Sequence, residues 1–231
     1  MKPLILVYVD HPMCSIDCAD ATCEVINQSG IYDAKMIGPD SHPYLKFNKQ
    51  NISDADCLVF PGGDGDADQF DNSLYKHKRM VQEYVSLGGK YLGICQGGYF
   101  ASRHYFDLLG HIKAEQHIKR KGASARRDGA AVVPIIWRDQ KPARIYFHDG
   151  ASFVPDAESD LESCEVLGRY HNGDAAALIQ PFWDGAVGVF GPHPEAMRWW
   201  FYSQWYIKND WKRPLQHHLL LDLLSVLLNK Y

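Results

Sequence analysis

The sequence lacks several features that would define its class at once. No run of about 18 apolar residues occurs, so no segment is expected to span a membrane. The short apolar stretch near the start does not resemble a signal peptide. The formal net charge of −4 argues against nucleic-acid binding, which normally needs a basic face. Six cysteines are not spaced as a disulfide framework or as paired CxxC zinc knuckles, so we expect a protein of the reducing cytoplasm.

What is present is typical of a globular protein. The chain has 231 residues, of which 46% are apolar and 23% charged, and this is enough for a substantial core. No repeat, low-complexity segment or linker divides it, so residues 1–231 are predicted to form a single domain.

The first half alternates between apolar strands and helices, which predicts a doubly wound, mainly parallel sheet. Continuous apolar runs predict strands buried on both faces. The expected strands are residues 3–9, 32–37, 57–60 and 91–94, the expected helices are 17–28 and 72–87, and residues 39–50 are expected to be a loop.

The second half has a different pattern. Short strands separated by turn signals predict antiparallel or mixed strands and hairpins beside the parallel sheet. These strands are expected at residues 130–137, 143–148, 164–171, 175–180 and 186–190, and closing helices at 194–209 and 214–229.

The most informative stretch is residues 90–102, an apolar strand that ends on Cys95 and leads into a helix. Gly93 and Gly97 flank this cysteine, as a strained nucleophile elbow requires. The following helix N-terminus favours a thiolate, so Cys95 is the predicted nucleophile.

Two other segments also end apolar strands and should reach the same sheet edge. His193 is followed by Pro194 and Glu195, so a base and the carboxylate that orients it can lie close together. Pro61-Gly62-Gly63 leaves backbone N–H groups accessible. The N–H groups of Gly63 and Gln96 are the predicted oxyanion hole.

These motifs, in this order, resemble the class I glutamine amidotransferase-like superfamily. The closer likeness is to the N-terminal domain of eukaryotic biotin-protein ligases and its stand-alone bacterial relatives, through residues 93–102, 145–150 and 175–195. The resemblance implies a flavodoxin-like, three-layer α/β fold and a Cys95–His193–Glu195 triad. It does not imply biotinylation, because we expect no ligase catalytic domain here.

The resemblance and the residues together predict a cysteine-dependent amidohydrolase or amidotransferase-like enzyme. It would act on a small-molecule or peptide amide without a metal or organic cofactor. Gly62, Gly97 and Tyr99 are predicted to contact the substrate. Glutaminases usually carry a Gly-His-Gln-like run after the nucleophile, and the different residues here argue against glutamine as the physiological substrate.

Other interpretations remain open at this point. The chain could be a catalytically silent binding or regulatory domain. A related protease or deglycase is disfavoured because Gln96 stands where those enzymes usually place a histidine. His148-Asp149-Gly150 is interpreted as a hairpin turn that could line the pocket.

Several clusters have no assigned role. Cys14, Cys18 and Cys23 near His11 resemble a metal cluster but are interpreted as ordinary thiols, with Cys14 at the rim of the site. Basic residues at 119–121 and 126–127 are interpreted as a solvated loop rather than an anion site. The aromatic residues of 199–211 are expected mainly in the core, and an exposed subset would form a homodimer interface.

Overall fold

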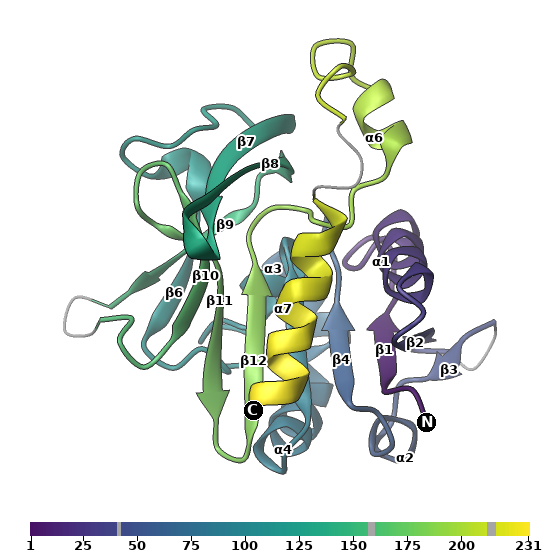
Figure 1. Ribbon diagram of the computed structural model, residues 1–231. Helices are drawn as coiled ribbons and strands as arrows, with labels where there is room; N and C mark the ends of the chain where they lie inside the picture. Colours follow the sequence, from purple (N-terminus) through teal and green to yellow (C-terminus); the bar gives the residue numbers. More distant parts are fainter. Residues whose placement is uncertain (41–42, 157–159, 212–215) are drawn as a thin grey trace.

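A sheet of twelve strands organises the protein. The computed structural model describes residues 1–40, 43–156, 160–211 and 216–231. The main strand order is β3-β2-β1-β4-β5-β12-β11-β10-β7-β8 (Figure 1). The predicted α/β class, with parallel strands in the first half and antiparallel strands in the second, is confirmed.

The parallel part of the sheet runs from β3 to β12. It comprises β3 (Leu45–Lys46), β2 (Asp33–Gly38), β1 (Leu4–Tyr8), β4 (Cys57–Phe60), β5 (Lys90–Ile94) and β12 (Gly185–Phe190). The inner strands β4, β5 and β12 are buried at every residue, as their apolar runs predict. Their carboxyl ends therefore meet at one edge of the sheet.

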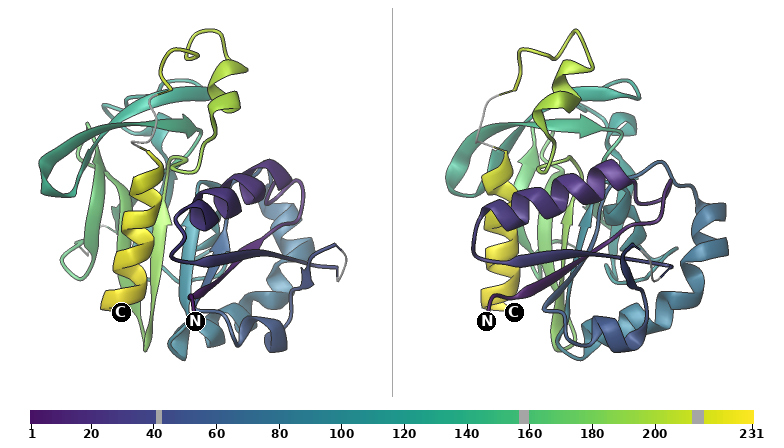
Figure 2. Two further views of the ribbon diagram at one scale, coloured as in Figure 1. Left: turned by 45° about the vertical axis from the view of Figure 1, so that its right-hand side comes forward. Right: turned by 90° about the vertical axis from the view of Figure 1, so that its right-hand side faces the viewer.

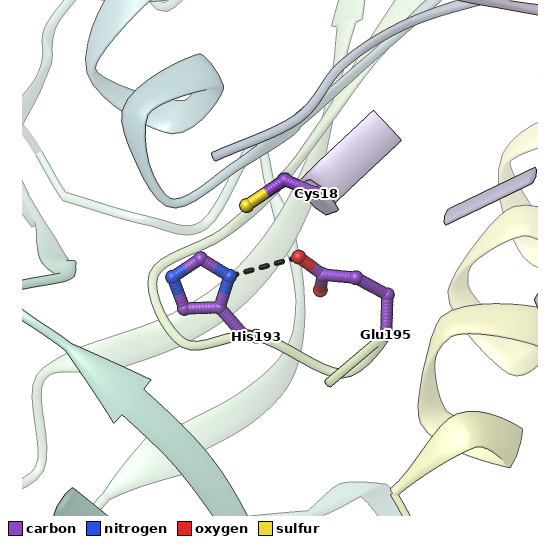
Figure 3. A group of neighbouring side chains, drawn as sticks. All are labelled: Cys18, His193 and Glu195. Carbon is purple, nitrogen blue, oxygen red and sulfur yellow. Dashed lines mark hydrogen bonds and ion pairs between the residues drawn. The ribbon is translucent and has the colours of Figure 1, made fainter. Parts of the chain in front are cut away.

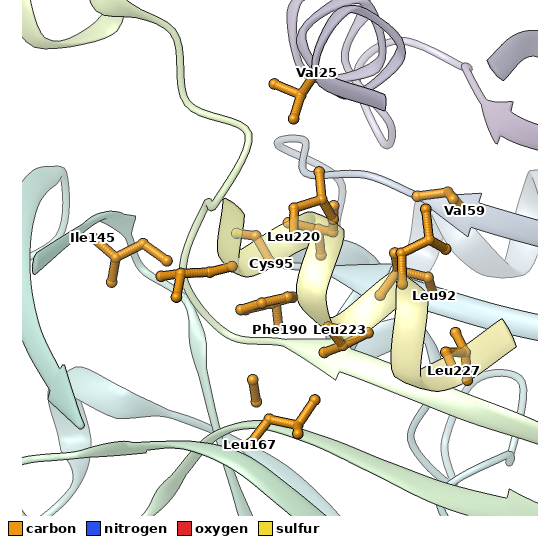
Figure 4. Close-up of a cluster of buried hydrophobic side chains, with 14 of the residues drawn as sticks. Val25, Val59, Leu92, Cys95, Ile145, Leu167, Phe190, Leu220, Leu223 and Leu227 are labelled. Carbon is orange, nitrogen blue, oxygen red and sulfur yellow. The ribbon is translucent and has the colours of Figure 1, made fainter. Parts of the chain in front are cut away.

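Helices cover both faces of this part and complete three layers. Helices α1 (Ile16–Gln28) and α7 (His217–Lys230) lie on one face, and α3 (Ala67–Ser73), α4 (Lys78–Ser86) and α5 (Gln96–Phe100) lie on the other (Figure 2). The leucines of α7 pack on Val59, Leu92 and Phe190 (Figure 4). Burying each of them contributes about 1.5–3 kcal/mol.

The antiparallel strands extend the sheet beyond β12. They are β11 (Ala175–Phe182), β10 (Glu165–Tyr170), β7 (Ala130–Trp137) and β8 (Lys141–His148), while β9 (Ala151–Pro155) pairs with β11 and β6 (Ile112–Gln116). Figures 1 and 2 show β7 and β8 arching over the end of the molecule where the parallel strands finish. They close one side of the candidate site.

Some predicted elements were wrong. The helix expected at residues 72–87 is divided by the 3-10 turn Tyr75–His77, and α3 begins earlier because Asp66 and Gln69 form a capping box. The expected loop 39–50 contains β3 and the start of α2 (Lys49–Ile52). The helix expected at 194–209 is reduced to α6 (Arg198–Tyr202).

The strands β6 and β9 were not predicted, and the last helix was predicted well. Helix α7 matches the expected span from residue 217, while residues 214 and 215 lie outside the described residues. None of the described helices is long and apolar enough to cross a membrane.

Candidate active site

Cys95 lies at a strained turn between β5 and α5. Its φ of 50° and ψ of −107° fall outside the regions that non-glycine residues normally adopt. A Cβ atom on Gly93 would lie 2.3 Å from the carbonyl oxygen of Gly97, and one on Gly97 would lie 1.8 Å from that of Phe60. The turn is thus possible only because both flanking residues are glycine.

His193 and Glu195 follow β12 and reach the same edge of the sheet. The Nδ1 atom of His193 lies 2.8 Å from Oε1 of Glu195, and the two residues are 4% and 0% exposed. The backbone N–H of His193 donates to the carbonyl of Tyr146 on β8, which fixes the turn from the antiparallel side. The imidazole and the carboxylate point toward each other in Figure 3.

The surroundings of His193 favour its charged form. Burial alone would lower its pKa, but the facing Cys95 and Glu195 raise the pKa well above the usual value, through their negative charge and hydrogen bonds. The Cys95 sulfur also lies 3.5 Å from the carbonyl oxygen of His148. A buried imidazole that faces a cysteine and a carboxylate is suited to general acid–base chemistry.

The loop after β4 places Gly62 and Gly63 beside this group. A Cβ atom on Gly62 would lie 2.5 Å from Cε1 of His193, so Gly62 packs against the imidazole. Among the described residues, no hydrogen-bond acceptor is found for the backbone N–H groups of Gly63 and Gln96 in the turns and loops or on side chains. Both residues line the same cavity as Cys95.

That cavity has a volume of about 690 Å³. Its walls carry acidic and aromatic side chains from both halves of the sheet, and among the described residues no lysine or arginine lines it. The acidic lining residues are Asp17, Asp64, Asp128 and Asp149, and the aromatic ones are Tyr99, Tyr105, Tyr146, Trp199 and Trp200. The cavity is large enough for a small molecule or the end of a peptide.

The residues predicted to contact substrate divide into two groups. Tyr99 lines the cavity, and its hydroxyl donates to the carbonyl of Asp149. Gly62 and Gly97 do not line it, because one packs behind His193 and the other against the Phe60 backbone. Their placement corresponds to close packing rather than substrate contact.

The structure also adds residues that were not expected in the site. Cys18, in the first turn of α1, lines the cavity, whereas Cys14 is fully buried with its sulfur 3.7 Å from the Pro61 carbonyl. The prediction that Cys14 lies at the rim was therefore wrong. The sequence signal for Cys18 is its position just after β1, at the carboxyl edge of the sheet.

The other clusters are now placed. His148 and Asp149 line the cavity. In the basic segment, Arg120 is held by ion pairs to Asp174 and Glu115 and is not a free cation. Trp200 and Phe201 are buried, while Trp199 and Trp205 are 55% and 80% exposed.

Comparisons with known proteins agree with the motifs. Residues 49–121, which include the elbow, match the family model described as the N terminal of biotin-protein ligase. The chain is 30% identical over 163 residues to the biotin-protein ligase of Schizosaccharomyces pombe, an alignment covering 60% of this chain and 25% of that protein. The chain thus spans about a quarter of the length of this curated relative.

Solved structures share the fold across the whole chain. A glutamine amidotransferase from Thermotoga maritima matches with a TM-score of 0.66 at 11% identity, covering 99% of both chains. The PurLQS structure from the same organism matches with a TM-score of 0.64 at 16% identity, covering 98% of this chain and 100% of the other. The predicted resemblance to the amidotransferase-like fold and to the biotin-protein ligase N-terminal family is thereby confirmed.

Proposed function

We propose that this chain, which resembles the N-terminal domain of biotin-protein ligases, is a cysteine-dependent amidohydrolase or amidotransferase-like enzyme. One observation carries the proposal. A strained cysteine and a buried imidazole line one cavity, and a buried carboxylate lies 2.8 Å from the imidazole. A nucleophile, a base and a group that orients the base are what thiol-mediated acyl transfer requires.

In the first half of the reaction, the Cys95 thiolate attacks the carbonyl carbon of an amide. The negative charge that develops on the carbonyl oxygen is stabilised by the N–H groups of Gly63 and Gln96, each contributing about 3 kcal/mol at the transition state. His193 then donates a proton to the nitrogen of the leaving amine. The C–N bond breaks, and the acyl group remains on Cys95 as a thioester.

In the second half, the neutral imidazole of His193 accepts a proton from a water molecule. The oxygen of that water attacks the thioester carbonyl, the C–S bond breaks, and the carboxylic acid product leaves. The thiolate of Cys95 and the imidazolium of His193 are restored. Glu195 keeps Nδ1 of the ring protonated and oriented throughout.

The residues that line the cavity favour a substrate whose groups next to the reacting amide are neutral or positively charged. Four aspartates and five aromatic side chains line the cavity, and no lysine or arginine of the described residues does. Apart from the catalytic imidazole, a substrate carboxylate would meet like charges and no lysine or arginine of the described residues, whereas a cation can also lie on aromatic faces. This argues further against glutamine, whose α-carboxylate needs a positive or N–H-rich site.

The state of the thiols supports the expected compartment. All six cysteines are free, and Cys14, Cys18 and Cys57 are buried with Cys95. A cysteine nucleophile needs a reducing environment to stay active. We therefore propose a cytoplasmic setting.

The proposal is tested with a panel of chromogenic anilides that carry a cationic, a neutral or a carboxylate-bearing acyl group. We expect the cationic and neutral anilides to release the aniline fastest and the release to be lost in Cys95→Ala. Intact-protein mass spectrometry should find the acyl group on Cys95. Preference for the carboxylate-bearing anilide would refute the substrate class, and absence of both turnover and acylation would favour a silent binding domain.

A further inference from the structure

The mechanism leaves a buried thiol of the site without a role. The sulfur of Cys18 comes from α1 and lies beside the His193–Glu195 pair, as Figure 3 shows. One ligand atom from each of Cys18, His193 and Glu195 lies within 4.8 Å of the other two. All three residues are buried, with Cys18 8% exposed.

A second observation points to a ligand at this position. Oε1 of Glu195 interacts with His193, but Oε2 is buried and has no hydrogen-bond partner among the described residues. An unpaired buried carboxylate oxygen destabilises the protein, so a positively charged ligand that binds it would be stabilised there. Gly62 packs closely against this group, since a Cβ atom there would lie 2.5 Å from Cε1 of His193 and 3.2 Å from the Cys18 sulfur, and it thereby holds the two side chains near each other.

We propose that Cys18, His193 and Glu195 form a binding site for a thiophilic divalent cation such as Zn²⁺. Thiolate, imidazole and carboxylate are all zinc ligands, and they disfavour the hard cations Mg²⁺ and Ca²⁺. At metal–ligand distances of about 2.0–2.3 Å, tetrahedral ligand atoms lie about 3.3–3.8 Å apart, so the side chains need to close by only about 1 Å.

The protein would supply three of the four zinc ligands and leave the fourth coordination position open. Cys18 and His193 both line the cavity, so a fourth position faces solvent and can hold water. Binding releases the proton of the Cys18 thiol and the proton shared by His193 and Glu195. The cation would then hold the imidazole that the proposed reaction needs, so metal binding switches the enzyme off; this second consequence rests on the proposed function.

Cobalt tests the site without depending on activity. Co²⁺ added to the wild-type protein should produce the near-ultraviolet charge-transfer band of a cobalt–thiolate bond, and Zn²⁺ should remove it at one equivalent. The band should persist in Cys95→Ser and disappear in Cys18→Ser. Cys23→Ser, on the same helix outside the site, is the matched control and should bind like the wild type.

Titration calorimetry with Zn²⁺ measures how strongly each protein binds the metal. Cys18→Ser should weaken Zn²⁺ binding by about 100-fold or more, because a thiolate that coordinates the metal directly is lost. A band that survives in Cys18→Ser, or one lost only in Cys95→Ser, would overturn the site, since the metal would then be held by the nucleophile. Circular dichroism of Cys18→Ser checks that the fold is kept.

Inhibition of the enzyme by Zn²⁺ is tested separately, by the reactivity of Cys95. Zn²⁺ should slow iodoacetamide labelling of Cys95 in the wild type, a chelator should restore it, and Cys18→Ser should lose this protection. Labelling that Zn²⁺ leaves unchanged in a protein with the cobalt band would refute inhibition. A band in a protein whose Cys95 is unreactive would refute the catalytic proposal and support the metal site alone.

Discussion

The substitution Gly62→Ala tests how tightly the imidazole is positioned. Gly62 does not have a positive φ, so its backbone accepts alanine. The added Cβ would lie 2.5 Å from Cε1 of His193, whereas ordinary van der Waals contact begins at 3.4 Å. The ring must therefore move by about 1 Å, and a misplacement of this size in a catalytic group costs about 100-fold in rate.

The assay is single-turnover acylation of Cys95 by an activated nitrophenyl ester, read from nitrophenolate release. We expect the Gly62→Ala protein to acylate about 100-fold more slowly while its circular dichroism remains that of the wild type. The matched control is Gly188→Ala on β12, whose Cβ would lie 2.8 Å from the end of Leu223 on α7. The control should be less stable by about 1–3 kcal/mol and acylate at the wild-type rate.

Two results would refute this reasoning. Acylation of Gly62→Ala at the wild-type rate would mean that the imidazole position is not limiting. An equal decrease in both variants would mean that the loss reflects general destabilisation rather than displacement of His193.

Three further predictions concern titrating groups. Glu195→Gln removes a charge that raises the pKa of His193, so the imidazole should titrate at lower pH by NMR, and an unchanged pKa contradicts this. Burial raises the pKa of Asp174, but hydrogen bonds from Arg120 outweigh it and lower the pKa. Arg120→Met should thus lower the free energy of unfolding by about 2 kcal/mol at pH 7. The difference between the variant and the wild type, measured by urea unfolding, should decrease as the pH falls below about 4 and Asp174 becomes protonated in both. Burial lowers the pKa of His117 to about 4. Below about pH 6.5 the histidine therefore binds a proton in the unfolded chain before it does in the folded protein, so the free energy of unfolding should decrease as the pH falls. A free energy of unfolding that stays constant between about pH 6.5 and 4 would contradict this prediction.

The parts of the site set by local sequence could be predicted. Cys95 and its glycines are contiguous, and His193 and Glu195 are separated by one proline, so their spacing alone indicates the geometry. The inner strands have continuous apolar runs because both faces are covered, and that pattern was sufficient to find them.

The parts of the fold and of the site that depend on tertiary packing could not be predicted from the sequence. β6 has the sequence Ile-Lys-Ala-Glu-Gln, whose polar residues give little strand signal, and it forms by pairing with β9. The aromatic run at α6 resembles a core helix, yet only part of it is buried. Cys18 follows β1 and so lies at the carboxyl edge of the sheet, but its place beside His193 and Glu195 depends on how α1 packs.

The central claim is that Cys95 is an activated nucleophile, and the rate of iodoacetamide labelling at pH 7 tests it most directly. Burial raises the pKa of every other cysteine, to about 12 for Cys18 and Cys23, so these thiols should remain protonated and slow. Peptide mapping should show Cys95 labelled at least about 100-fold faster than Cys164, and His193→Ala should remove most of this advantage. Labelling of Cys95 no faster than Cys164 would contradict the account.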